Sequence, residues 1–195
     1  MKNVKDILTF LIIVGCLNGC SADLSDYNKA DAPFDIKEYF TGDLVAWGML
    51  QDYTDKVNRR FCVEINGSWT GNKGILAEKF YFDDGEITYR NWQLTKTVDG
   101  TYQGEAEDVV GIAIGKHKGF AFQFSYNLLI EVDDSTYEVA MDDWMYQIDK
   151  YRVMNKTSIS KLGINVANVS LFFDKQSSVK TCASSIPMSF SQEKS

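Results

Sequence analysis

The sequence predicts an all-β protein, folded as an antiparallel β-barrel of about eight to ten strands. Short runs of alternating apolar and polar residues fill the region 37–176, and turn residues separate these runs. No long stretch has the periodicity of an amphipathic helix. Hydrophobic residues make up 45% of the 195 residues, which is enough for one domain with a core.

Nine runs have the length and spacing of strands in such a barrel. They cover residues 42–52, 59–67, 74–85, 87–96, 101–111, 119–134, 136–144, 145–155 and 168–175. The segment 154–164 breaks the alternation, so we expect a short helix or an irregular crossover there.

The clearest strand covers residues 120–132, where large apolar side chains alternate with other residues. Its apolar face carries Phe120, Phe122, Phe124, Tyr126, Leu128, Ile130 and Val132. The same rhythm puts Phe61, Val63 and Ile65 on the core side of an earlier strand. Cys62 is therefore expected to point away from the core.

The run 74–96 predicts a hairpin with a charged pair on an apolar face. A three-residue loop, Asp83-Asp84-Gly85, pairs residue 82 with residue 86 and therefore Glu78 with Arg90. A two-residue loop would instead pair residue 78 with residue 91. An inward charge needs a partner, so the Glu78–Arg90 pair is either structural or a polar anchor for a ligand head group inside the barrel.

The stretch "MDDWMYQID", residues 141–149, sets two adjacent carboxylates against a tryptophan. On an extended strand Asp142 and Asp143 point to opposite faces, so they cannot flank one substrate as a catalytic pair. Asp149 follows without the spacing of metal ligands. We therefore expect a structural corner in which one Asp holds the backbone and Trp144 plugs the barrel. A ligand contact and a catalytic carboxylate are the alternatives.

The first nineteen residues have the pattern of a bacterial lipoprotein signal peptide. Two lysines precede an apolar stretch that is too short to span a bilayer. Leu17-Asn18-Gly19-Cys20 resembles a lipobox, after which Cys20 would carry the lipid and anchor the chain durably in a membrane. Cys16 ends a competing box, and an ordinary secretory signal is a further alternative. Cys20 is preferred because a polar run that can serve as a tether follows it directly.

Ser21 follows the lipid-bearing position where an inner-membrane signal would have Asp, so we expect sorting to the outer membrane with the domain in the periplasm. The resulting organisation is a signal peptide (1–19), a lipidated tether (20–36), a barrel domain (37–176) and a C-terminal tail (177–195). Past Cys20 only Cys62 and Cys182 remain. In an exported protein this favours a disulfide between them, and two separate buried thiols are the alternative.

Composition and motifs exclude several classes of function. The net charge is −7 and the sequence pI is about 4.7, which argues against nucleic acid as a partner. The single histidine, His117, lies between glycines and is expected at the tip of a turn. No nucleophile elbow or phosphate-binding loop is present in the sequence. We therefore expect no enzyme activity, no cofactor and no metal, and the sequence identifies no protein partner.

Several fragments resemble a proteobacterial family of predicted lipoproteins, catalogued as domain of unknown function, family 3833. They are "FTGDLVAWGMLQD", "RRFCVEINGSWTGNKGILAEKFYFDDGE", "YQGEAEDVVGIAIG", "DDWMYQID" and "SKLGINVANVSLFF". The likeness covers about residues 37–176 and implies no activity. More loosely the pattern is similar to calycins, the lipocalin-like barrels. The Gly-x-Trp motif of that group is not matched, since Gly42 and Trp47 are five residues apart, but Arg152 could take the place of its late arginine.

Two classes of function remain. The first is a binding module that carries a lipid or another apolar ligand in the barrel. The second is a structural or accessory envelope protein whose barrel is filled with side chains. The residues expected to contact a ligand are Trp47, Glu78, Arg90, Trp92, Phe122, Phe124, Tyr126, Trp144 and Arg152. In this hypothesis the rings hold an apolar tail, while Glu78, Arg90 and Arg152 hold a polar head group.

Overall fold

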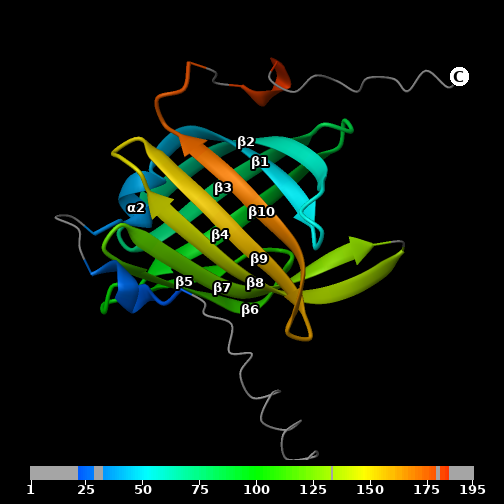
Figure 1. Ribbon diagram of the computed structural model, residues 1–195. Helices are drawn as coiled ribbons and strands as arrows, with labels where there is room; N and C mark the ends of the chain where they lie inside the picture. Colours follow the sequence, from blue (N-terminus) through cyan, green and yellow to red (C-terminus); the bar gives the residue numbers. More distant parts are fainter. Residues whose placement is uncertain (1–21, 29–32, 133, 179–180, 185–195) are drawn as a thin grey trace, which may run out of the picture.

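The computed structural model describes residues 22–28, 33–132, 134–178 and 181–184. These residues form a closed barrel of ten antiparallel strands (Figure 1), as the sequence predicted. The strands are β1 Gly42–Asp52, β2 Val57–Thr70, β3 Lys73–Phe82, β4 Ile87–Lys96, β5 Tyr102–Glu105, β6 Val109–Lys118, β7 Ala121–Val132, β8 Ser135–Gln147, β9 Arg152–Lys161 and β10 Ile164–Asp174. The short helical segments are η1 Leu24–Tyr27, α2 Ile36–Tyr39 and η2 Cys182–Ser184.

The barrel closes where its first strand meets its last. Each strand pairs with the next along the chain, and β1 also pairs with β10, with Trp47 opposite Phe172. This last ladder removes the two open edges that an unclosed sheet would present. It also sorts every strand into one face toward the lumen and one face toward the outside.

The hairpin β3–β4 has the predicted register. Phe82 and Glu86 flank the loop, Gly85 has a φ of 90°, and Glu78 lies opposite Arg90. A left-handed residue at the third loop position is the geometry that glycine allows without strain.

Four parts of the chain differ from the expected assignment. Run 101–111 is divided between β5 and β6, and run 145–155 spans the end of β8, a turn and the start of β9. Segment 154–164 is neither helix nor crossover but contains the end of β9 and the turn into β10. Its alternation was hidden because polar side chains, Asn155 and Thr157, face inward. His117 lies in β6 and not at the tip of a turn. Gly115 before it belongs to the strand and not to a turn, and a Cβ at Gly115 would collide with the ring of Phe122.

One end of the barrel is plugged by α2 and the residues around it (Figure 1). Phe34, Ile36, Tyr39 and Phe40 are buried there against the inward side chains of the strands. Asp35 caps the helix by accepting hydrogen bonds from the amides of residues 37 and 38. Residues 34–36, which were expected to belong to the tether, thus lie in the plug.

The hydroxyl of Tyr39 donates to the carbonyl of Tyr151 at 2.9 Å and so ties the plug to the β8–β9 turn. Lys96 and Tyr102 also bind the Asp35 carboxylate from the barrel wall. Gly67 permits this close fit, because a Cβ there would overlap the carbonyl of Phe40. The plug is therefore fastened to several strands, and the opposite end of the lumen is left as the mouth.

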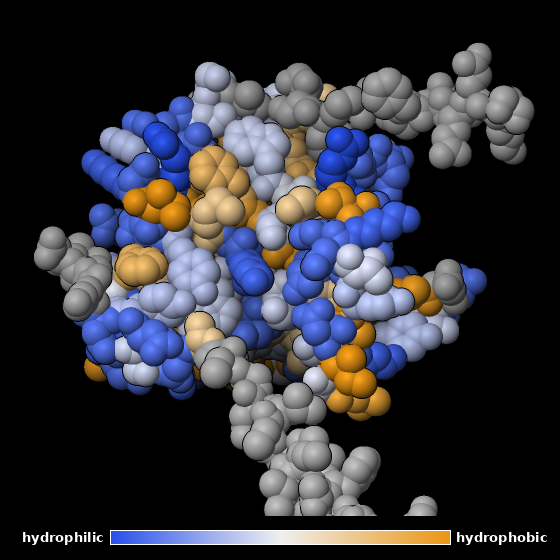
Figure 2. Space-filling model, in the orientation of Figure 1, coloured by the Kyte–Doolittle hydropathy of each residue, from blue (hydrophilic) through white to orange (hydrophobic). Residues whose placement is uncertain are grey.

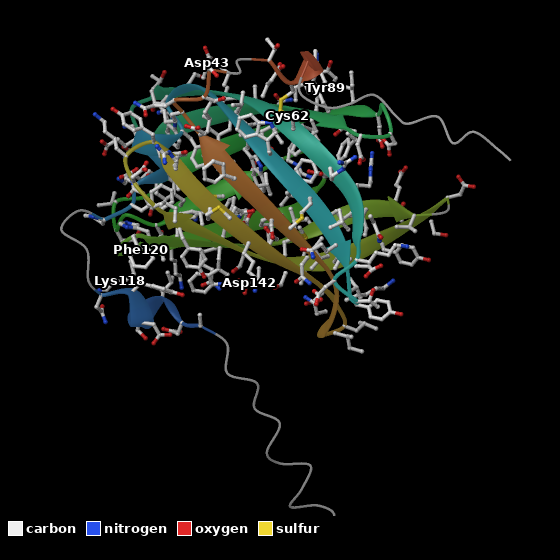
Figure 3. The ribbon with its side chains drawn as sticks, turned by 45° about the horizontal axis from the view of Figure 1, so that its top comes forward. Asp43, Cys62, Tyr89, Lys118, Phe120 and Asp142 are labelled. Carbon is white, nitrogen blue, oxygen red and sulfur yellow. A yellow bond between two sulfur atoms is a disulfide. The ribbon has the colours of Figure 1, made fainter. Side chains whose placement is uncertain are left out.

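A disulfide joins Cys62 to Cys182, the pairing expected from the sequence, with 5.6 Å between the Cα atoms. Cys62 points outward from β2, and η2 lies over it on the outside of the wall (Figure 3). The amide of Cys182 donates to Glu64 at 2.7 Å. The C-terminal segment is therefore held on the outer face of β2, away from the lumen.

We expect Cys182→Ala to lower the free energy of unfolding by about 2–4 kcal/mol, because the bond closes a loop of 120 residues in the unfolded chain. Urea unfolding with and without reductant measures this. Reductant should bring the wild type to the stability of the variant and leave the variant unchanged. Equal stability of the oxidised and reduced wild type would contradict the prediction.

Candidate functional site: the lumen of the barrel

A cavity of about 330 Å³ lies inside the barrel, between the plug and the mouth. Eight of the ten strands, all but β5 and β6, contribute to its lining, together with Ile36 and Phe40 from the plug. This volume lies at the lower end of the range for small-molecule sites. The barrel is thus only partly filled by its own side chains.

Aromatic rings form one wall of the cavity. The inward face of β7 carries Phe122, Phe124 and Tyr126, as its alternation predicted. Trp92 of β4 packs against two of these rings, with centroids 5.1 Å from Phe124 and 5.2 Å from Tyr126. Rings at these separations are in contact, and with aliphatic neighbours they provide a surface for an apolar ligand. Phe120, in contrast, lies outside the barrel beside Tyr27.

Charged side chains occupy another part of the lining. Glu78 and Arg90 face each other across β3 and β4 and both reach the cavity. The guanidinium of Arg90 donates to Asp108 instead, with its Nη2 atom 2.6 Å from the carboxylate. Within the described part of the chain, the Glu78 carboxylate has no hydrogen-bonded partner. Glu78 and Arg90 are therefore opposite each other in the strand register, as expected, but the hydrogen bonds of Arg90 go to Asp108.

Asp143 is a lining residue that the sequence did not identify as one. It is buried on the inward face of β8, between the inward-facing Met141 and Met145. The side-chain amide of Asn155 donates to its carboxylate. Thr157 also hydrogen-bonds to it. In the sequence, Asp143 shares one face of the strand with the apolar residues Met141 and Met145, which indicates an inward position. This indication conflicted with the expectation that Trp144 faces inward.

Burial raises the pKa of both inward carboxyls. For Glu78 the pKa rises to about 7, because loss of hydration outweighs the attraction of Arg90, and the charges of Asp143 and Asp108 add to the effect. For Asp143 loss of hydration also raises the pKa to about 7, against the hydrogen bonds from Asn155 and Thr157.

Three of the expected contact residues do not reach the lumen. Trp47 faces outward on β1, where it lines an external apolar groove with Met49 and Phe172. Trp144 faces outward on β8, and its indole donates to Asp142 at 3.1 Å. Arg152 is exposed at the start of β9, with its Nε atom 3.6 Å from Asp149. The remaining six expected residues, Glu78, Arg90, Trp92, Phe122, Phe124 and Tyr126, all line the cavity.

The stretch "MDDWMYQID" is mostly strand, and the expected corner lies only at its end, where Asp149 holds the backbone by accepting hydrogen bonds from the amides of Tyr151 and Arg152. Asp142 lies on the outside, on the same side of the barrel as Phe120 (Figure 3), and accepts a hydrogen bond from Gln123. Trp144 does not plug the lumen, because Tyr27 of η1 packs on its ring from outside and buries it there. The two adjacent carboxylates do face opposite sides, as strand geometry required.

The mouth of the lumen has charged and apolar residues around it. The guanidinium of Arg59 lies over the ring of Phe82 and binds Asp84 and Glu86, each at 2.8 Å. The β7–β8 hairpin extends beyond the wall at this end (Figure 1). Exposed apolar side chains gather at the neighbouring β9–β10 turn (Figure 2), where Leu162 is 95% exposed.

The described residues do not form a metal site. They contain no group of three or more His, Cys, Asp or Glu side chains arranged to hold a metal ion. No helix among them is long and apolar enough to cross a bilayer. The expected lipidation site, Cys20, and the competing Cys16 lie outside the described residues.

Comparison with known proteins identifies the family. The family model described as "Protein of unknown function (DUF3833)" matches residues 14–175. The chain belongs to this family. The description gives the family no activity, so no residue role is carried over from it. None of the curated proteins matches the chain.

A solved structure supports the fold of this family member. The S-type phycobiliprotein lyase CPES from Guillardia theta is similar, with a TM-score of 0.52 and 9% sequence identity. The similarity covers 75% of this chain and 95% of that protein. At this identity the likeness concerns the fold alone, a lipocalin-like barrel.

The raised pKa values predict a dependence of stability on pH. A carboxyl whose pKa is higher in the folded state stabilises the fold below its unfolded pKa of about 4, and this stabilisation is lost as pH rises through about 7. Glu78→Gln and Asp143→Asn should therefore gain stability relative to wild type between about pH 5 and pH 8, each by on the order of 1–2 kcal/mol.

Urea unfolding of the wild type and the variants across this range measures the difference. Asp142→Asn removes one outward carboxylate on the same strand and is the matched control for the loss of a charge. If Asp142→Asn shows the same pH-dependent gain as Asp143→Asn, the effect does not arise from the lumen.

Proposed function

We propose that this protein binds a small apolar or amphipathic ligand in the lumen of its barrel, while a lipid on Cys20 anchors it at the periplasmic face of the outer membrane. The observation that carries the binding function is the cavity of about 330 Å³ with aromatic and aliphatic walls. A barrel of this kind can be filled by side chains or can hold one ligand. The unfilled lumen favours the ligand over the alternative of a filled structural spacer.

The arrangement of the two ends supports entry from one side. The plug of Phe34, Ile36, Tyr39 and Phe40 closes one end with buried side chains. At the other end the lining continues to Arg59 and to neighbours such as Leu50 and Ile130. A ligand would enter between the hairpins of this mouth and place its far end near the aromatic wall.

The comparison with a lyase does not by itself bring chemistry to this chain. Our proposal is binding, because the walls of the cavity consist mainly of aromatic and aliphatic side chains. The shared barrel shape supports a role that depends on an enclosed volume.

The anchor rests on the sequence pattern at the N-terminus. Leu17-Asn18-Gly19-Cys20 provides the processing site. The segment η1, four residues further on, already packs against the barrel beside Phe120 and Tyr146. Four residues span at most about 14 Å, so a lipid on Cys20 would hold the barrel close to the membrane surface.

The binding function is tested with a neutral naphthylamine fluorophore and the mature chain from Ser21, which keeps every residue that the structure describes. We expect saturable fluorescence and its loss in Val169→Trp, which puts an indole into the cavity from β10. Ser170→Trp places the same side chain on the outer face of the same strand and should bind the fluorophore like the wild type.

Leu171→Trp is a second lumen variant in case Val169→Trp does not fold, and thermal unfolding confirms folding of each. Absence of binding in the wild type would contradict the proposal. Equal binding by the lumen variants and by Ser170→Trp would also contradict it, because the fluorophore would then sit outside the barrel.

For the anchor, we expect Cys20→Ala to abolish incorporation of labelled palmitate in a bacterial host, because the acceptor thiol and the acylated amine are both lost. Cys16→Ala is the matched control and should still be labelled and processed. Labelling of Cys20→Ala, with loss of label in Cys16→Ala, would move the anchor to Cys16.

A further inference from the structure

The charges around the lumen are unequal. Three carboxyls, of Glu78, Asp108 and Asp143, surround the single guanidinium of Arg90. Glu78, Arg90 and Asp143 all reach the cavity itself. In their ionised forms the carboxylates leave an excess of negative charge beside an apolar space, where water cannot solvate it fully.

The hydrogen bonds show which of these groups are free for a ligand. Arg90 gives its Nε and Nη2 donors to Asp108. Asp143 accepts from Asn155. Among the described residues, the polar groups at the cavity that make no hydrogen bond include the carboxylate of Glu78, the hydroxyl of Tyr126, the indole N–H of Trp92 and the Nε atom of Arg59. Glu78 is the only carboxyl among these groups, so its carboxylate is the lining acceptor that a hydrogen-bond donor on a ligand would satisfy.

The arginine at the mouth does not change this balance. Arg59 lines the cavity, but its guanidinium is bound by Asp84 and Glu86, 2.8 Å from each. An anionic head group would find the charge of both lining arginines already balanced by carboxylates, and only the Nε atom of Arg59 is left without a hydrogen bond. It would also add a further negative charge to a region of low dielectric constant, where like charges repel strongly.

We propose that the lumen selects an amphipathic ligand whose head group is a hydrogen-bond donor without negative charge, an amine or a hydroxyl, held between Glu78 and Asp143. This inference rests on the proposed binding function and specifies its ligand class. It revises the expectation that Glu78, Arg90 and Arg152 together hold a polar head group, because Arg152 lies outside and Arg90 is engaged by Asp108.

Three compounds with the same chain and different heads test the proposal. Decylamine, decanol and decanoate compete with the neutral naphthylamine fluorophore for the mature chain at about pH 8, where the two carboxyls with pKa values of about 7 are mostly ionised. The concentrations of decylamine and decanol at half-displacement should be lower than that of decanoate by about ten-fold or more. Lowering the pH to about 6 protonates the carboxyls and should reduce this preference.

Glu78→Gln combined with Asp143→Asn should bring decylamine and decanoate to within about three-fold of each other, because the lumen then carries no unbalanced carboxylate. Glu64→Gln combined with Asp142→Asn removes two carboxylates from the outer faces of β2 and β8 and should keep the preference of the wild type. Each single lumen variant serves if the double variant does not fold.

The outcomes separate this inference from the proposed function. If the fluorophore binds and decanoate displaces it as well as decylamine does, the lumen binds ligands but our ligand class is wrong. A preference that survives in the lumen double variant, or disappears in the outer double variant, would also overturn the inference. If the fluorophore does not bind at all, the proposed function itself fails.

Discussion

The structure depends on the ladder between β1 and β10, which closes the sheet. Without it the two strands would each expose an edge, and the inward faces would not enclose a volume. Because the sheet is closed, each residue of the wall faces either the lumen or the outside of the barrel. Closure thereby brings side chains from β3, β4, β7, β8 and β9, far apart in sequence, to one cavity. The plug at α2 completes the enclosure at one end, so the lumen is accessible from the mouth.

Alternation along the chain was sufficient to predict the fold class, the inward face of β7 and the register of β3 with β4. It did not reveal which face of β1 and β8 is inward. Trp47 was assigned to the lumen because it is large and apolar, yet Ala46 beside it is the residue that faces the core. In a barrel of limited diameter a small residue leaves room for a neighbouring ring, and a Cβ on Gly48 would collide with the ring of Phe61 on the adjacent strand β2.

Trp144 illustrates a second limit of alternation. Its ring is 8% exposed although it lies outside the wall, because Tyr27 packs on it from η1. A segment that precedes the barrel in sequence can thus cover an outward position. Such a position can then hold a large apolar residue, as a core position does. The partnership of Arg90 with Asp108 was missed for a different reason. Asp108 lies between β5 and β6, and the pairing of the short strand β5 with β4 brings it beside Arg90.

The polar part of the lumen is difficult to explain as a stabilising element. If Glu78 and Arg90 existed to neutralise each other, their closest contact would be mutual, whereas Arg90 is bound by Asp108 and Glu78 is left facing the cavity. Apolar residues at positions 78 and 143 would avoid the loss of hydration that raises both pKa values. Sequences depart from the rule of a satisfied interior chiefly where function requires it. An unfilled apolar cavity with an unsatisfied acceptor on its wall is such a departure, and a ligand that brings a donor would satisfy both features at once.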